Sequence, residues 1–184
     1  MRYFLLFIPT LLLFNACASK EYYTFGDISQ INHIQSCHQT IAIDKVKVPK
    51  YLTDNAIVKQ VSPYKVIRIK NANWLTPMQK RLTNVLINYL QKSLNNPNIY
   101  LYPWESRKKD TDKRVSVKIQ RFIAYNNRVR LEASYQIKNI KIKQKTTKLF
   151  DTTVVTSNTI ESMMGAMEEA YFRLAKEIKT DIIK

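Results

Sequence analysis

The chain of 184 residues contains little glycine, histidine and cysteine, with two of each. Two glycines cannot form the Gly-rich loops that bind nucleotide phosphates. Neither histidine stands in an HExxH motif, and no serine lies in a G-x-S-x-G motif. The sequence therefore carries no catalytic constellation that we recognise, and we predict that the protein is not an enzyme and uses no cofactor.

Histidine and cysteine gather in one segment, at His33, Cys37 and His38. A closed tetrahedral metal site needs a fourth donor of matching type, and no second group of cysteine or histidine occurs in the chain. We interpret this segment as a polar loop with an incidental thiol, and we predict no metal site.

Acidic residues are also scarce, since 14 Asp and Glu face 30 Lys and Arg, for a net charge of +16. An exported protein would not routinely meet nucleic acid, so we expect no nucleic-acid partner. Anionic lipid headgroups, lipopolysaccharide phosphates or an acidic protein are the accessible counterparts. The alternative is that the lysines simply form a solvated face.

Long hydrophobic runs are absent except at the start of the chain. The run Tyr3–Phe14 covers 12 residues, whereas a spanning helix needs about 20. Arg2 before the run and Asn15-Ala16 after it are typical of a signal peptide, here residues 1–16. The run ends at Cys17, and the pattern resembles a bacterial lipoprotein signal in which Cys17 becomes the acylated first residue. The alternative is an ordinary signal peptide that ends near a cysteine.

Hydropathy periods predict the elements of one domain. Strands are expected at 22–25, 40–48, 56–61, 65–70, 98–102, 115–119, 129–137 and 149–157, and helices after Thr76 and over 160–182. Residues 17–39 would form an anchored N-terminal segment with the first short strand, and residues 40–184 the remainder of the domain. Short connections favour hairpins, so we predict an α+β fold: a mostly antiparallel twisted sheet with two helices packed on one face.

Two local signals refine this prediction. Thr76, Pro77 and Gln79 have the spacing of a capping box with proline at the first helical position. Asn126 and Asn127 stand between two alternating runs and suit the positive φ angles of a tight hairpin. The methionines of the last helix fall on its apolar stripe, which we interpret as core.

Four segments in order carry a family resemblance: Tyr22–Phe25, IAIDKVKVPKYLTDNAIV (41–58), NWLTPMQKRLTNVLINYLQKSL (73–94) and VSVKIQRF (115–122). Together they resemble the ABC-type transport auxiliary lipoproteins, relatives of the lipoprotein of the paraquat-inducible operon. The most specific part is Val48–Leu52, followed by a strand and a helix led by tryptophan.

The resemblance implies a periplasmic component of an MCE-type ABC system that moves phospholipids or other lipids between the inner and outer membranes. Its partners would be the membrane, through the lipid on Cys17, an MCE-domain protein, and a separate permease and ATPase; a homo-oligomer stays open. Ala18-Ser19 after Cys17 resembles an outer-membrane address on the periplasmic face, with the inner membrane as the other option.

We hypothesise that a turn and nearby aromatics bind the partner: Pro49, Lys50, Tyr51, Leu52 and Trp104. Aromatic side chains bring large apolar area to an interface at low entropy cost. The alternative is that Tyr51 and Leu52 close the core beneath the turn. Two other functions stay open: a structural or assembly lipoprotein of the envelope without lipid transport, and a lipid carrier with its own apolar cavity.

Overall fold

A computed structural model describes residues 19–32, 36–103 and 111–184. The predicted signal peptide, Cys17, His33 and Trp104 lie outside the described residues. The described part has two helices and eight strands, and the predicted α+β class is confirmed.

The strands form two sheets, where the sequence indicated one. The smaller sheet has the order β1 (Glu21–Tyr23), β4 (Lys65–Trp74), β3 (Ala56–Ser62). The larger sheet has the order β5 (Ile99–Leu101), β2 (Ile41–Ile43), β6 (Lys113–Tyr125), β7 (Arg128–Asn139), β8 (Lys145–Val155). The long pairs β3–β4, β6–β7 and β7–β8 are antiparallel, as predicted, while the three-residue strands β1, β2 and β5 pair in parallel.

The predicted strand 40–48 is shorter than expected, because regular pairing stops after Ile43. The chain stays beside β6 through two further hydrogen bonds, from Asp44 N to Val115 O and from Lys47 N to Val117 O, both 2.9 Å. An isolated bridge then joins Lys47 to Lys118. The irregularity predicted near Asp44 therefore ends the strand and does not merely bulge it.

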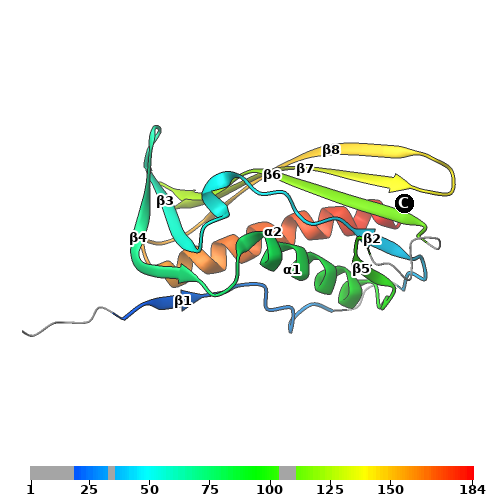
Figure 1. The fold of residues 1–184 in the computed structure, drawn as a ribbon, viewed down its shortest axis with the longest axis horizontal. Coiled ribbons are helices and arrows are strands. Elements are labelled where there is room, and N and C mark those ends of the chain that lie inside the picture. Colours follow the sequence, from blue (N-terminus) through cyan, green and yellow to red (C-terminus); the bar gives the residue numbers. More distant parts are fainter. Residues whose placement is uncertain (1–18, 33–35, 104–110) are drawn as a thin grey trace, which may run out of the picture.

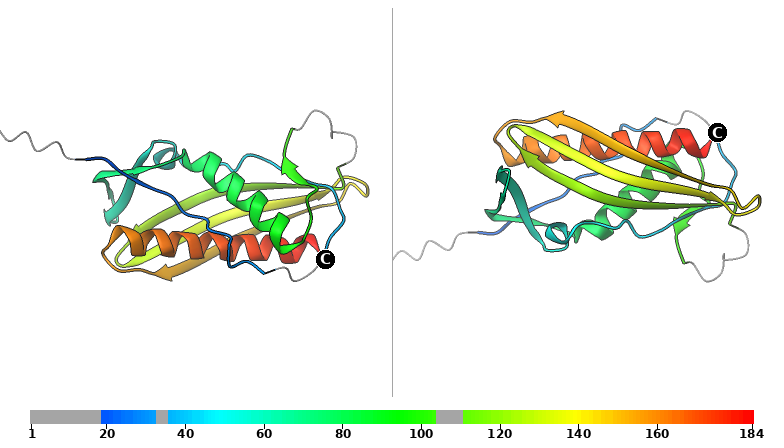
Figure 2. Two further views of the ribbon diagram at one scale, coloured as in Figure 1. Left: turned by 90° about the horizontal axis from the view of Figure 1, so that it is seen from below. Right: turned by 90° about the horizontal axis from the view of Figure 1, so that it is seen from above.

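Helices α1 (Met78–Ser93) and α2 (Ile160–Ile182) lie on the same face of the larger sheet (Figures 1 and 2). The view from above in Figure 2 leaves the opposite face of the sheet uncovered by helices. This layering confirms that both helices pack on one face. The β3–β4 hairpin stands up at one end of the larger sheet, beside the β6–β7 turn (Figure 1).

The core lies between this sheet and the helices. Inward residues of β6 and β7 meet the apolar stripes of α1 and α2, and the three methionines Met163, Met164 and Met167 are buried, as predicted. Phe25 makes edge-to-face contacts with Trp74, Phe122 and Tyr171 at centroid distances of 6.1–6.3 Å. This cluster joins the N-terminal segment to both sheets and to α2.

The helix starts differ from each other. The capping box predicted for α1 is wrong, because Pro77 itself occupies the N-cap in an extended conformation and no side chain caps the helix. The first helix therefore begins one residue later than predicted, at Met78. In α2, the Thr159 side chain accepts the backbone N–H of Ser162 at 3.2 Å.

The N-terminal segment crosses the helices and is fixed to them. Gly26 has φ +95° and lies so close to Val85 that a Cβ there would overlap it. The Glu168 carboxylate accepts the backbone N–H groups of both Gly26 and Asp27. Lys92 donates to the carbonyls of Ile28 and Ser29 at 2.6 and 2.7 Å. Residues 24–29 thus pack as part of the domain.

A cluster of polar side chains attaches the C-terminal end of α2 to strands β7 and β8. The Tyr135 hydroxyl lies 2.9 Å from Glu177 Oε1 and 2.6 Å from Asp181 Oδ2. Lys148 Nζ is 2.7 Å from Asp181 Oδ2, and Lys184 Nζ is 3.1 Å from Asp181 Oδ1. The Asp181 side chain is only 8% exposed, so its charge is held among several donors.

Candidate functional site

An irregularity in β6 places an arginine, Arg121, on the face of the larger sheet that no helix covers. Pairing with β7 is regular up to Ile119 opposite Ala133, and then resumes with Arg121 opposite Glu132. Gln120 is the extra residue of a β-bulge, which shifts the alternation of side chains by one. Without the bulge Arg121 would point into the core, and with it Arg121 lies on the outer face.

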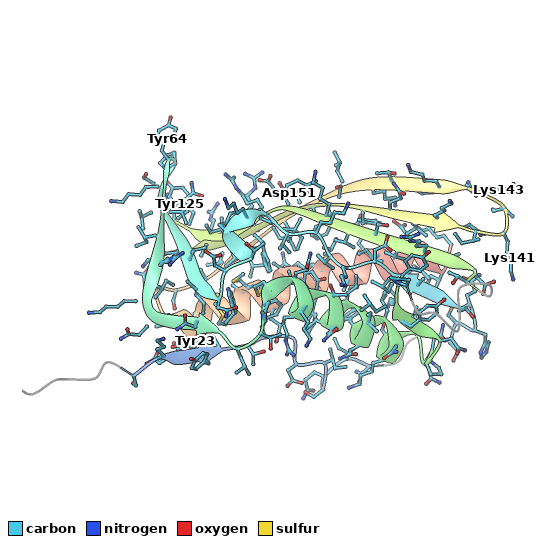
Figure 3. All side chains as sticks on the ribbon, viewed as in Figure 1. Tyr23, Tyr64, Tyr125, Lys141, Lys143 and Asp151 are labelled. Carbon is cyan, nitrogen blue, oxygen red and sulfur yellow. The ribbon has the colours of Figure 1, made fainter. Side chains whose placement is uncertain are left out.

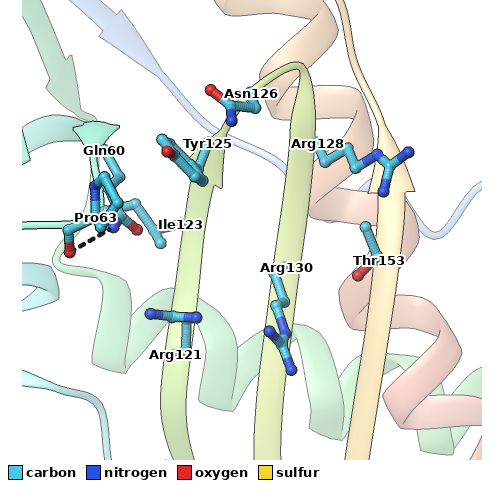
Figure 4. Close-up of a pocket in the computed structure, with 9 residues that line it drawn as sticks. All are labelled: Gln60, Pro63, Arg121, Ile123, Tyr125, Asn126, Arg128, Arg130 and Thr153. Atoms are coloured by element: carbon cyan, nitrogen blue, oxygen red, sulfur yellow. Dashed lines mark hydrogen bonds between the residues drawn. The ribbon is translucent and has the colours of Figure 1, made fainter.

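The β6–β7 turn adds two further arginines to that face. Asn126 and Asn127 take φ angles of 47° and 55°, which confirms the predicted tight hairpin. Arg128 and Arg130 then follow on β7, two residues apart, and side chains at this spacing share a face. Figure 4 shows Arg121 and Arg130 at a similar level on neighbouring strands, with Arg128 one step nearer the turn and directed toward β8.

Two carboxylates hold one of these arginines in place. Arg130 Nε lies 2.9 Å from Glu132 Oε1, and its NH2 lies 2.7 Å from Asp151 Oδ2. The same Glu132 oxygen is 3.4 Å from Arg121 NH1. The hydrogen bond to Asp151 and the charge of Glu132 raise the pKa of Arg130 above its usual value. Arg130 is therefore charged at any physiological pH.

Among the described residues, Arg128 is not paired with a carboxylate as Arg130 is. Across residues 19–32, 36–103 and 111–184, no carboxylate pairs with the Arg128 guanidinium. Its charge is available to a bound group.

The β3–β4 hairpin turns this face into a hollow of about 650 Å³, which we call the arginine groove. Gln60 and Pro63 of the hairpin stand on one side, and Tyr125, Arg121, Arg128 and Arg130 come from the sheet (Figure 4). Ile123 is 4% exposed and contributes to the floor. The lining contains no carboxylate, so the groove offers mainly hydrogen-bond donors and positive charge.

The predicted partner-binding turn contacts β6 next to the bulge at Gln120. Lys50–Leu52 form one turn of 3-10 helix, and Lys50 is exposed. The Tyr51 hydroxyl accepts the backbone N–H of Phe122 at 2.8 Å, and burial raises the pKa of Tyr51. Leu52 is 2% exposed and fills the core. Only Pro49, Lys50 and part of Tyr51 therefore offer surface on this turn.

The remaining residues singled out from the sequence lie apart from the groove. Cys37 is half-buried and unpaired as a thiol, and no group of three His, Cys, Asp or Glu side chains in the described ranges could hold a metal ion. None of the described helices is both long enough and apolar enough to cross a membrane.

Sequence reasoning missed the arginine groove. The alternation of Arg128 and Arg130 after an Asn-Asn turn was the available signal, because it places both on one face. The β3–β4 hairpin itself was expected from the strands predicted at 56–61 and 65–70. Its position beside β6, and the bulge that turns Arg121 outward, depend on pairings that were not predicted.

Comparisons with known proteins give one family and a shared fold. A family model described as ABC-type transport auxiliary lipoprotein component matches residues 23–179. A crystal structure of an uncharacterised protein is similar with a TM-score of 0.70 and 19% identity, and covers 89% of this chain and 99% of that one. A crystal structure of a Xanthomonas campestris protein is similar with a TM-score of 0.69 and 12% identity, and covers 81% and 88%. No curated protein matches the chain.

Proposed function

Since the chain belongs to the family of ABC-type transport auxiliary lipoprotein components, we propose that it serves an MCE-type ABC system that moves phospholipids or other lipids between the inner and outer membranes. The family consists of auxiliary components and is not a known enzyme family. The observation that carries the proposal is the family match, which covers almost all of the described domain.

The proposed anchor is a lipid on Cys17. The first strand begins at Glu21, four residues later, and an extended chain spans at most about 3.6 Å per residue. The tether would therefore hold β1 within about 15 Å of the bilayer surface. Two or more acyl chains give stable attachment without any spanning segment. We propose the periplasmic face of the outer membrane as the site of attachment, and the inner membrane is the alternative.

The proposed contact with the MCE-domain protein is the turn at Pro49–Tyr51, with Trp104 as a second element. Lys50 is exposed at the centre of the turn, while Leu52 supports it from the core. Because the Tyr51 hydroxyl accepts a hydrogen bond from the backbone of Phe122 in β6, the turn is held in position before any partner binds. A fixed turn loses little conformational freedom on binding.

A capture experiment tests this function. The full chain in mild detergent is immobilised and exposed to an MCE-domain protein of the same organism. Wild type should capture that protein, and Lys50→Glu should weaken capture at least tenfold. Lys176→Glu is the matched control, because it makes the same charge reversal on exposed α2 surface.

Failure has two distinct forms. If Lys50→Glu captures the partner as well as wild type does, the turn is not the interface. If wild type captures no MCE-domain protein, the alternative function is favoured, namely a structural or assembly lipoprotein of the envelope.

A further inference from the structure

We propose that the arginine groove binds a phosphate group, and that its ligand is the headgroup phosphate of an anionic phospholipid. This inference goes beyond the proposed function, because it depends neither on Cys17 nor on an MCE partner. It rests on the donor set, the charge balance and the wall of the groove.

The donor set fits a phosphate. Arg121, Arg128 and Arg130 line one hollow from two neighbouring strands. Guanidinium groups are planar, always charged, and present paired N–H donors that match two phosphate oxygens. Arg130 uses Nε and NH2 for Glu132 and Asp151, so it is already oriented and keeps its remaining N–H donors for a ligand. A donor fixed in advance loses less side-chain freedom on binding.

The charge balance favours a phosphodiester. Glu132 and Asp151 offset two of the three guanidinium charges from outside the lining, and the charge of Arg128 stays uncompensated. The site thus carries about one net positive charge, which a phosphodiester with its single negative charge neutralises. Arg128 is the residue on which the inference depends most.

The wall of the groove favours a lipid over free phosphate. Pro63 and Gln60 lead directly to the hairpin tip, where Tyr64 is fully exposed and Val61 and Val66 are 42% and 47% exposed. Figure 3 shows Tyr64 at the end of the hairpin, directed away from the body of the protein. Tyrosine and valine beside a phosphate site are suited to the region where headgroup and acyl chains meet.

Calorimetric titration of the full chain in non-ionic detergent tests the site. The probes are dihexanoyl phosphatidylglycerol, its zwitterionic phosphatidylcholine counterpart, and inorganic phosphate. We expect saturable binding of one phosphatidylglycerol per chain, competition by inorganic phosphate, and at least tenfold weaker binding of phosphatidylcholine. Arg128→Gln should weaken phosphatidylglycerol binding at least tenfold without lowering the unfolding midpoint, because no carboxylate is left unpaired.

Lys138→Gln is the matched control, since it removes one charge from the outer face of the same strand, ten residues away. It should change binding by less than twofold. Equal weakening by Arg128→Gln and Lys138→Gln would mean attraction to overall charge and would overturn the site. Absence of saturable binding by both anionic probes would also overturn it. Binding of inorganic phosphate without phosphatidylglycerol would keep the phosphate site and reject the lipid as its ligand.

Discussion

Replacement of Asp181 by asparagine is expected to destabilise the domain in a manner that depends on pH. Burial raises the pKa of Asp181, but hydrogen bonds from Lys148, Tyr135 and Lys184 outweigh burial and lower it to about 2. A fall from 3.8 to about 2 corresponds to about 2 kcal/mol of stability at neutral pH. A carboxylate in the last turn of a helix costs about 0.3–1 kcal/mol. Removing the charge recovers that cost, so the expected net loss is about 1.5 kcal/mol.

The sign of the pH effect follows from the lowered pKa. The folded state binds the proton less tightly than the unfolded state, so the contribution of Asp181 is fully present above about pH 4. It is lost as the pH falls through about 2. The difference between wild type and Asp181→Asn should therefore shrink to about half at pH 3.

Urea unfolding of the full chain in mild detergent, followed by far-UV circular dichroism at pH 7 and pH 3, measures this difference. Glu169→Gln is the control, because Glu169 is 55% exposed in an i,i+4 pair with Arg173. Such a surface pair is worth less than about 0.5 kcal/mol. An equal loss for Asp181→Asn at both pH values, or no loss at pH 7, would refute the reasoning.

Three further predictions concern the anchor, the core and the glycines. Cys17→Ser should abolish acyl labelling and release the protein from membranes, and unchanged labelling would reject the anchor. Leu82→Asp and Leu174→Asp each place an unpaired charge where the wild-type leucine is 0–1% exposed. Each should lower the free energy of unfolding by about 3–5 kcal/mol, measured in thermal melts. Variants that melt like wild type would contradict the assignment of these helix faces to the core. Gly26→Ala should destabilise the domain, because Gly26 has a positive φ and a Cβ there would overlap α1. Gly165→Ala lies in open space within α2 and should stabilise the domain by about 1 kcal/mol. Changes of the same sign in the free energy of urea unfolding would contradict this account.

The parts of the fold that local chemistry decides could be predicted from the sequence. The β6–β7 hairpin follows from the alternation over 115–119 and 129–137 on either side of Asn126-Asn127, whose positive φ angles the structure confirms. Both helices follow from apolar stripes at helical spacing, and these stripes are buried as expected. Each of these signals lies within a short window of the chain.

The parts that long-range pairing decides could not be predicted. Strands β1, β2 and β5 have three residues each, too few to show a period, and their parallel partners are far away in sequence. The division into two sheets depends on those pairings. The arginine groove depends on one extra residue, Gln120, whose effect on the register appears only when β6 is laid against β7.

The parallel pairing of β1 with β4 determines how tension on the N-terminus enters the domain. Glu21, Tyr22 and Tyr23 lie opposite Ala72, Asn73 and Trp74, so β1 and β4 run in the same direction. A pull from that end loads the inter-strand hydrogen bonds together, in shear, and does not open them one at a time. Behind them, Glu168 holds the backbone at Gly26 and Asp27. A domain anchored at this end would therefore meet a pull along β1 with hydrogen bonds loaded in shear, and its core would stay folded until they broke.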